Sequence, residues 1–240
     1  MRLRSTVAAG WVSLALLAAG CGRMPGYPAG KYVPPDQVKN FRTLYNTNCR
    51  ACHGPGGENG PAIDLANPEY QALVDDASLR NIIAKGMPGT QMPAWAQSAG
   101  GMLTDAQVDA IVAGMRKEWQ KPNAFEGTTP PPLVQPAIPD AKTRAAAVKQ
   151  GRQLYQAHCA SCHTGPARQQ LTSPIYLALI SDQALRSIII AGRPDIGQPD
   201  WRHDNGQLSP QDVTNIVAYL GSLRNSITIS APAVPLSSRR

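Results

Sequence analysis

Apolar side chains recur along the chain at the three- and four-residue spacing that is typical of amphipathic helices. The residues that carry this spacing are Val38, Phe41 and Tyr45 in the first half and Val148, Gly151 and Tyr155 in the second. No alternating run of β-branched residues favours a sheet. The pattern therefore predicts an all-α fold.

Capping residues, proline and glycine indicate where these helices are expected to begin and end. Pro35 and Asp36 are typical of a helix start. Thr104 and Ser209 are expected to be N-caps of later helices, because their hydroxyl groups accept hydrogen bonds from free backbone N–H groups. Gly86 and Gly192 are expected to end helices in the left-handed conformation, which glycine adopts without a steric penalty.

The chain contains one unit twice. The stretches Val38–Tyr45 and Val148–Tyr155 share Val, Lys, Arg, Leu and Tyr in the same order. Further on, the segments that begin at Asp76 and Asp182 share an Asp-x-x-Leu-Arg-x-Ile-Ile pattern. Similarity in a fixed order is the signature of duplicated structure. We call the two copies the first and second repeat.

The duplication divides the chain into successive parts. The boundaries that we predict are a signal peptide at 1–20, a tether at 21–34, a first domain at 35–120, a linker at 121–140, a second domain at 141–225 and a tail at 226–240. The linker is rich in proline, which predicts a semi-rigid, extended spacer. The two ends are rich in proline and serine and are expected to lie over the surface or to stay mobile.

The first twenty residues have the layout of an export signal. Arg2 and Arg4 precede an apolar stretch that ends in small residues before Cys21. Ala19, Gly20 and Cys21 resemble a bacterial lipobox, although leucine stands one position further from the cysteine than is usual. Cys21 is therefore predicted to be lipidated, on the periplasmic side of a bacterial membrane. The alternative is ordinary cleavage, which would leave an exposed thiol in an oxidising compartment.

Composition narrows the class of protein. No apolar run reaches the roughly 18–20 residues of a membrane-spanning helix. The formal net charge is +7, and residues 141–240 carry eleven basic and five acidic side chains. In an exported protein such a charge favours acidic proteins or anionic head groups as partners over nucleic acid. Aromatic residues make up only 5% of the chain, which is little for a protein-only core.

Each repeat carries a Cys-x-x-Cys-His motif. The motif residues are Cys49, Cys52 and His53 in the first repeat and Cys159, Cys162 and His163 in the second. Two cysteines at this spacing can form thioethers with the vinyl groups of one haem, and the next residue places an imidazole at the iron. A structural zinc site needs four protein ligands, and no further cysteine lies near either motif. A thioredoxin-like disulfide is typical of a βαβ context, which the pattern does not predict.

With these motifs, the chain resembles class I cytochromes c in tandem over about residues 35–119 and 141–224. The resemblance implies two all-α domains, each wrapped around a covalently bound haem c. The haem would supply the apolar core that so few aromatic residues cannot, because small domains bury little surface. It also accounts for all five cysteines, with four for two haems and Cys21 for the lipid.

The repeats differ where the family usually places a methionine as sixth iron ligand. In the first repeat Met92, followed by Pro93, matches the family's Met-Pro pattern, and Met87 is the rival. The second repeat aligns without a gap and has Gln198 opposite Met92. For the second haem, Gln198, His203, water or a partner's ligand remain open.

Two functions follow from the resemblance. The first is a membrane-tethered dihaem carrier that passes single electrons between a membrane oxidoreductase and a terminal acceptor such as an oxidase or a soluble cytochrome, within a respiratory chain or complex. No residue is assigned a catalytic role in this interpretation. The second is a dihaem redox enzyme that acts on peroxide, nitrogen oxides or sulfur compounds at an open second haem. Beyond His203 the chain offers no recognisable distal acid–base set.

Overall fold

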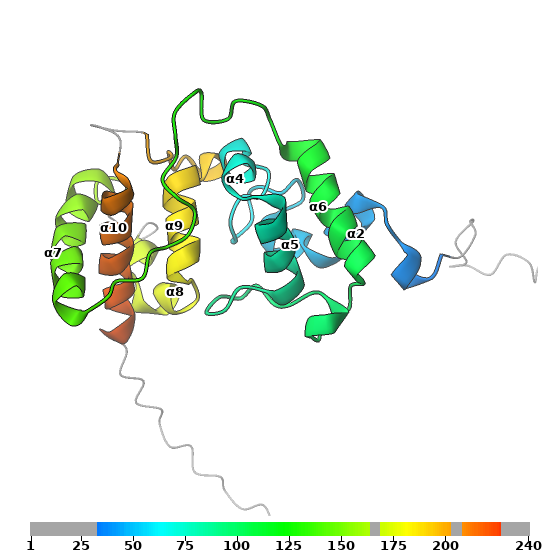
Figure 1. Ribbon diagram of the computed structural model, residues 1–240, viewed down its shortest axis with the longest axis horizontal. Coiled ribbons are helices and arrows are strands. Elements are labelled where there is room, and N and C mark those ends of the chain that lie inside the picture. The colour runs from blue at the N-terminus through cyan, green and yellow to red at the C-terminus, as the bar shows by residue number, and fades with distance from the viewer. Residues whose placement is uncertain (1–32, 164–168, 203–207, 227–240) are drawn as a thin grey trace, which may run out of the picture. The chain divides into compact units, whose positions relative to one another are not determined.

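The computed structural model describes residues 33–163, 169–202 and 208–226 (Figure 1). The expected signal peptide and Cys21 lie outside these residues, as does His203. The chain divides into a unit that ends at Gln37 and a larger unit that begins at Val38. In the first unit, η1 (Pro35–Gln37) is a short 3-10 helix. Both repeats lie in the second unit, which the following paragraphs describe.

The described residues are helical and contain no strand, which confirms the all-α prediction. The helices of the first repeat are α2 (Phe41–Asn48), α3 (Arg50–His53), α4 (Pro68–Leu73), α5 (Asp76–Lys85), η2 (Gln97–Ala99) and α6 (Asp105–Trp119). Those of the second repeat are α7 (Ala141–His158), η3 (Gln169–Thr172), α8 (Pro174–Ala178), α9 (Asp182–Ala191), η4 (Pro194–Ile196), α10 (Pro210–Ser222) and η5 (Leu223–Ser226). None of the described helices is long and apolar enough to cross a bilayer.

Helix starts follow the capping chemistry with one correction. Thr104 and Ser209 are N-caps, and each forms a capping box with the residue three positions later. The helix expected to start at Pro35 instead starts at Phe41, because the Asn40 side chain accepts the backbone N–H of Thr43 at 3.0 Å. Pro35 begins only a 3-10 turn.

Gly86 and Gly192 end α5 and α9, as predicted, but in a different conformation. Their φ values are 72° and 74°, with ψ near ±180°, so they occupy a region that is essentially restricted to glycine and is distinct from the left-handed helical one. A Cβ at Gly86 would approach the Met92 carbonyl oxygen to 2.7 Å. Glycine is therefore required both by φ and by the close return of the following loop.

Each repeat has its own apolar core, formed where its first and last helices pack together. Helices α2 and α6 pack against each other in the first repeat, as do α7 and α10 in the second (Figure 1). The first core includes Tyr45, Ile111 and Met115, and the second includes Tyr155, Ile216 and Leu220. Of the residues that carry the helical spacing in the sequence, Tyr45 and Tyr155 lie in these cores, and Val38 and Phe41 pack against the first.

The two helix crossings use one large and one small residue in opposite order. In the first repeat Phe41 lies on α2, and a Cβ at Gly114 on α6 would overlap its ring. The aligned positions in the second repeat are Gly151 on α7 and Tyr219 on α10. A Cβ at Gly151 would overlap the backbone of Asn215 and approach the Tyr219 Cβ to 2.9 Å. In each repeat, one helix therefore contributes the aromatic residue and the other contributes the glycine that contacts it.

Side chains of α9 hold the linker in place. Arg186 is fully buried and donates from Nε to the Pro132 carbonyl oxygen at 2.7 Å. Gln183 donates from Nε2 to the Leu133 carbonyl oxygen at 2.7 Å and accepts the backbone N–H of Gln135 at 2.9 Å. The proline-rich segment is thus bound along the second repeat and does more than separate two domains.

Candidate haem-attachment sites

The Cys-x-x-Cys-His motif of the first repeat forms a single turn directly after α2. Cys49 is the C-cap of α2, and α3 contains Cys52 and His53. The backbone N–H groups of Cys52 and His53 donate to the Cys49 carbonyl oxygen at 3.2 and 3.0 Å. This tight turn gathers both thiols and the imidazole within five residues.

The second repeat builds the same turn after α7. Cys159 is the C-cap of α7, and the N–H groups of Cys162 and His163 donate to its carbonyl oxygen at 3.2 and 3.0 Å. The backbone hydrogen bonds of the two motifs therefore agree. The structure brings the three predicted residues of each motif together in the same local geometry.

The imidazole of His53 is held in a defined orientation. It is buried, and its Nδ1 lies 2.9 Å from the Ile63 carbonyl oxygen. An Nδ1–H donated to a carbonyl leaves Nε2 as the basic nitrogen that binds a metal. Burial lowers the pKa of His53, which favours the neutral, ligating form.

Tyr45 supports the first motif, a role that the sequence did not assign. Its hydroxyl donates to the Gly54 carbonyl oxygen at 2.7 Å, immediately after His53. The signal was present in the sequence, because Tyr45 and Tyr155 both stand four residues before the first cysteine of a motif. The aromatic ring belongs to the core and its hydroxyl fixes the end of the haem-binding turn.

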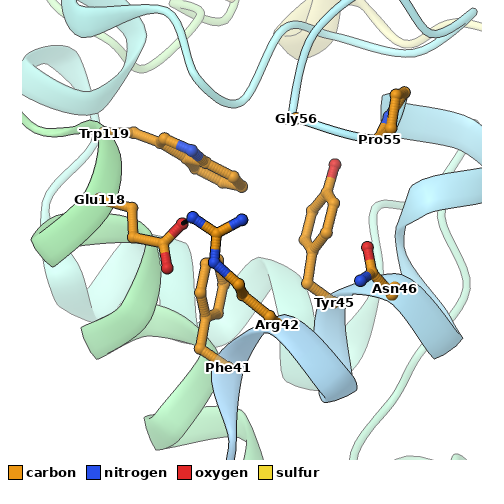
Figure 2. Close-up of a pocket in the computed structure, with 8 residues that line it drawn as sticks. All are labelled: Phe41, Arg42, Tyr45, Asn46, Pro55, Gly56, Glu118 and Trp119. Atoms are coloured by element: carbon orange, nitrogen blue, oxygen red, sulfur yellow. Dashed lines mark ion pairs between the residues drawn. The ribbon is translucent and has the colours of Figure 1, made fainter.

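A surface pocket of about 210 Å³ lies beside Tyr45, between α2 and the end of α6 (Figure 2). Phe41, Tyr45 and Trp119 contribute its aromatic lining, and Arg42 and Glu118 form an ion pair at 3.0 Å. Ligand pockets usually measure about 300–1,000 Å³, so this hollow is small for a cofactor. We assign it no binding role.

The first cysteine of each motif lies in an environment that disfavours the thiolate. Burial raises the pKa of Cys49 to about 12 and that of Cys159 to about 11. Zinc binds the deprotonated thiolate, which these environments disfavour. Among the described residues, no group of three or more His, Cys, Asp or Glu side chains is placed to hold a metal ion. Two cysteines beside an oriented imidazole match the arrangement expected for a covalently attached haem.

The loop after α5 presents two methionines in the first repeat. The N–H of Met87 donates to the Met92 carbonyl oxygen at 3.1 Å, which closes a short hairpin. Both side chains are half-buried. Met102 is 70% exposed and is not a candidate ligand in this arrangement. Met92 therefore stays the predicted ligand on its Met-Pro sequence, with Met87 as its rival.

The second repeat builds a similar hairpin without methionine. Arg193 and Gln198 stand at the positions of Met87 and Met92, and each donates its N–H to the other's carbonyl oxygen at 2.9 Å. The half-buried Gln198 side chain lies 3.4 Å from the Ile188 carbonyl oxygen. The hairpin is thus retained while its side chains change.

The charged residues of this second loop serve internal contacts. In the sequence alone, Arg193, Asp195, Asp200 and Arg202 allow two interpretations, a docking surface or simply a charged loop. The side chains of Arg193 and Asp195 are only 8% and 0% exposed and form an ion pair at 2.7 Å. Arg202 pairs with Asp200 and with Glu69 of the first repeat. Burial excludes Arg193 and Asp195 from a free docking surface.

Comparison with known proteins agrees with the two motifs. The family described as cytochrome c oxidase, cbb3-type, subunit III matches residues 36–113 and 146–220. Dihydro-heme d1 dehydrogenase of Pseudomonas aeruginosa is 42% identical over 72 residues, which make up 29% of this chain and 13% of that protein. The cytochrome bc1 complex cytochrome c subunits of Mycobacterium bovis and Mycobacterium tuberculosis are 24% identical over 187 residues, or 76% of this chain.

The chain spans only part of these relatives, since the aligned region covers 62% of the mycobacterial subunits. Among solved structures, a chain of the reducing HAO-like protein complex of Kuenenia stuttgartiensis aligns with 80% of this chain and 99% of its own length. That alignment has 17% sequence identity and a TM-score of 0.44.

Proposed function

Since the chain belongs to the family of cytochrome c oxidase, cbb3-type, subunit III, it is a c-type cytochrome, and we propose that it carries single electrons through two covalently bound haems. The carrying observation is that the two Cys-x-x-Cys-His turns have the same backbone hydrogen bonds. In each repeat the cysteines would hold the haem, and His53 and His163 would bind the iron. When bound, the haem supplies a reversible one-electron couple.

The protein's own residues would hold the haem rigidly rather than carry out acid–base chemistry. Ile63 orients the His53 ring through its carbonyl oxygen, and Tyr45 fixes the turn at Gly54. Fixed ligands limit the structural change between oxidised and reduced states. This supports an electron carrier, with Met92 as the sixth ligand in the first repeat.

The proposed partners are redox proteins. Relatives of this chain are named as subunits of the bc1 complex and as a dehydrogenase. These names support a place between a membrane oxidoreductase and a terminal acceptor, such as an oxidase or a soluble cytochrome, in a respiratory chain.

Haem stoichiometry tests this function directly. We expect the protein to carry two haems that survive denaturation, because thioethers are covalent, and mass spectrometry of the unfolded chain counts them. Replacing Cys49 and Cys52 by serine should leave one haem, as should replacing Cys159 and Cys162. A wild-type chain without covalent haem would overturn the proposed function.

We also propose that Cys21 is lipidated and tethers the protein to the periplasmic side of a bacterial membrane. The support is the small-residue context before Cys21, after an apolar stretch. Confinement near a membrane raises the effective concentration of membrane partners.

Cys21→Ser is expected to move the protein from the membrane fraction to the soluble periplasmic fraction, because the lipid attachment point is lost. Haem content should stay at two per chain, which distinguishes loss of the anchor from loss of folding. Fractionation without detergent followed by haem staining provides the measurement. A wild-type protein that is already soluble in this assay contradicts the anchor.

The alternative function is a dihaem redox enzyme with an open second haem. The observation that favours it is that Gln198 replaces methionine while the hairpin is retained. Carbon monoxide binding to the second haem of the reduced protein, together with turnover of peroxide, a nitrogen oxide or a sulfur compound, would support catalysis. Absence of both supports the carrier.

A further inference from the structure

Polar contacts join the two repeats at one place, which we call the inter-repeat seam. Its residues are Asn59, Gly60, Asn67 and Glu69 in the first repeat and Ala191, Gly192, Arg193, Asp195 and Arg202 in the second. All of them lie in the unit that begins at Val38. The seam brings together residues that are more than 120 positions apart in the chain.

The Arg193–Asp195 ion pair forms the charged part of the seam. Arg193 donates from Nη2 to the Gly60 carbonyl oxygen at 2.9 Å. Asp195 Oδ2 accepts the backbone N–H of Asn59 at 2.8 Å. The pair thus satisfies one acceptor and one donor of the first repeat. Burying both charges requires such partners, because an unpaired buried charge is strongly destabilising.

Asn67 forms the neutral part of the seam. Its Nδ2 donates to the Ala191 carbonyl oxygen at 2.8 Å and lies 3.3 Å from that of Gly192. Its Oδ1 accepts the N–H of Glu69 at 2.8 Å, as the N-cap of α4. One buried side chain therefore both starts a helix in the first repeat and holds the end of α9 in the second.

The charges of the seam exist only in the second copy of the loop. Arg193 aligns with Met87, Asp195 with Gly89 and Arg202 with Ala96. The first repeat uses this loop to present methionines. In the second repeat the same hairpin presents a buried ion pair to the neighbouring repeat. The loop without methionine is thus the loop that makes the contact.

The seam reaches the segment that orients His53. Asn59 and Gly60 lie between His53 and Ile63, whose carbonyl oxygen contacts the imidazole. A Cβ at Gly60 would approach the His53 carbonyl carbon to 2.6 Å and would overlap the Cys52 carbonyl oxygen, so this segment lies tightly against the first motif. The hairpin of the second repeat is therefore hydrogen-bonded to the segment of the first repeat that follows the Cys-x-x-Cys-His motif.

We propose that Arg193, Asp195 and Asn67 are positioning residues that hold the two haem sites in one fixed arrangement, so that an electron passes between them within the chain. The two bound haems would supply the one-electron couples, one being oxidised as the other is reduced, and no proton or further reactant would be needed. This inference rests on the proposed dihaem function. It adds that the seam sets the rate of internal transfer.

Two substitutions are designed to weaken the contact between the repeats while leaving each repeat folded. Asn67→Asp keeps an N-cap acceptor, since Asp and Asn cap equally well, but replaces the donor by a carboxylate that faces two carbonyl oxygens. Arg193→Gln leaves Asp195 buried without its partner. Asn40→Asp is the matched control, because Asn40 caps α2 and makes no seam contact in the described structure.

The measurements are small-angle scattering of the holoprotein and the rate at which an electron equilibrates between the haems after partial flash reduction. Loss of a buried partner predicts a fall of at least about 100-fold in the ratio of docked to undocked molecules for Arg193→Gln. The double variant Asn67→Asp/Arg193→Gln should therefore show a larger radius of gyration and a slower internal transfer. Asn40→Asp should match the wild type in both.

Haem counting keeps the test interpretable. If the double variant binds fewer than two haems, Glu69→Gln serves instead, because it removes only the negative charge that lies 3.3 Å from Arg202. It should then slow internal transfer by a smaller factor. Unchanged radius and unchanged transfer rate in a variant with two haems would overturn the seam's role. A wild type that holds two haems but exchanges no electrons with protein partners would overturn the carrier function and leave the seam result intact.

Discussion

Replacing Met92 by alanine is expected to abolish the charge-transfer absorbance that marks a methionine-ligated haem iron. The reason is that Met92 is the predicted sixth ligand and the second repeat has Gln198 at the aligned position. Methionine ligation raises the potential of a histidine-bound haem, so the potential of the first haem should fall in the variant. Absorbance spectroscopy of the oxidised protein and a redox titration measure both effects.

Met87→Ala is the matched control, because Met87 lies on the same hairpin and is half-buried like Met92. It should leave the absorbance intact. The opposite result, with the absorbance lost only in Met87→Ala, would make Met87 the ligand.

Gln198→Met extends the test to the second repeat. The hairpin is already closed by two hydrogen bonds at 2.9 Å, so the new methionine should take up the position of Met92 and raise the absorbance about twofold by adding a second His/Met haem. If the wild type already shows two methionine-ligated haems, the predicted asymmetry between the repeats is wrong.

The second large effect is expected at the crossing of α2 and α6. Gly114→Tyr should lower the free energy of unfolding by about 3 kcal/mol, because overpacking a tight contact has costs of this order. Phe41→Gly should cost about 3 kcal/mol through lost aromatic packing. Denaturant unfolding of the holoprotein, followed by haem absorbance, measures each value.

Combining the two changes should recover part of the loss. The double variant reproduces the order of the second repeat, where Gly151 faces Tyr219. We expect its destabilisation to be smaller than the sum of the single effects by about 1 kcal/mol or more, as is typical of residues in contact. Ala113→Tyr is the control, since Ala113 is an exposed neighbour on α6. It should cost less than about 1 kcal/mol. If the losses in the free energy of unfolding of the two single variants simply add, the proposed exchange of the aromatic residue between the helices is wrong.

Much of the molecule was predictable because its determinants are local. Covalent haem attachment needs two cysteines and a histidine at a fixed spacing. The site can therefore be predicted from Cys49, Cys52 and His53 without any knowledge of the fold. The cap residues Thr104 and Ser209 bond to backbone groups three residues away. The one misplaced start, at Pro35, arose because Asn40 is the residue that caps the helix.

Some differences between the aligned repeats can be explained only from the packing of the helices. In the sequence, the repeats simply differ at two aligned positions, which hold Phe41 and Gly114 in one and Gly151 and Tyr219 in the other. The structure shows that the two positions are in contact. The exchange then becomes a conservation of volume at one contact, because a tightly packed crossing has room for one large side chain. Tyr45 likewise becomes a support of the motif only when its hydroxyl is seen to reach Gly54.

The sequence by itself thus determined the helical class and the chemistry of the two motifs, since each depends on residues within a few positions of one another. It also determined the duplication, since the matching residues recur in the same order. Tertiary structure alone decided the fate of Arg193 and Asp195. As a sequence they are two charges in a loop, but their partners Gly60 and Asn59 lie 133 and 136 positions away. A charge becomes a buried contact or a solvated surface according to what the fold places beside it, and no local pattern encodes that neighbour.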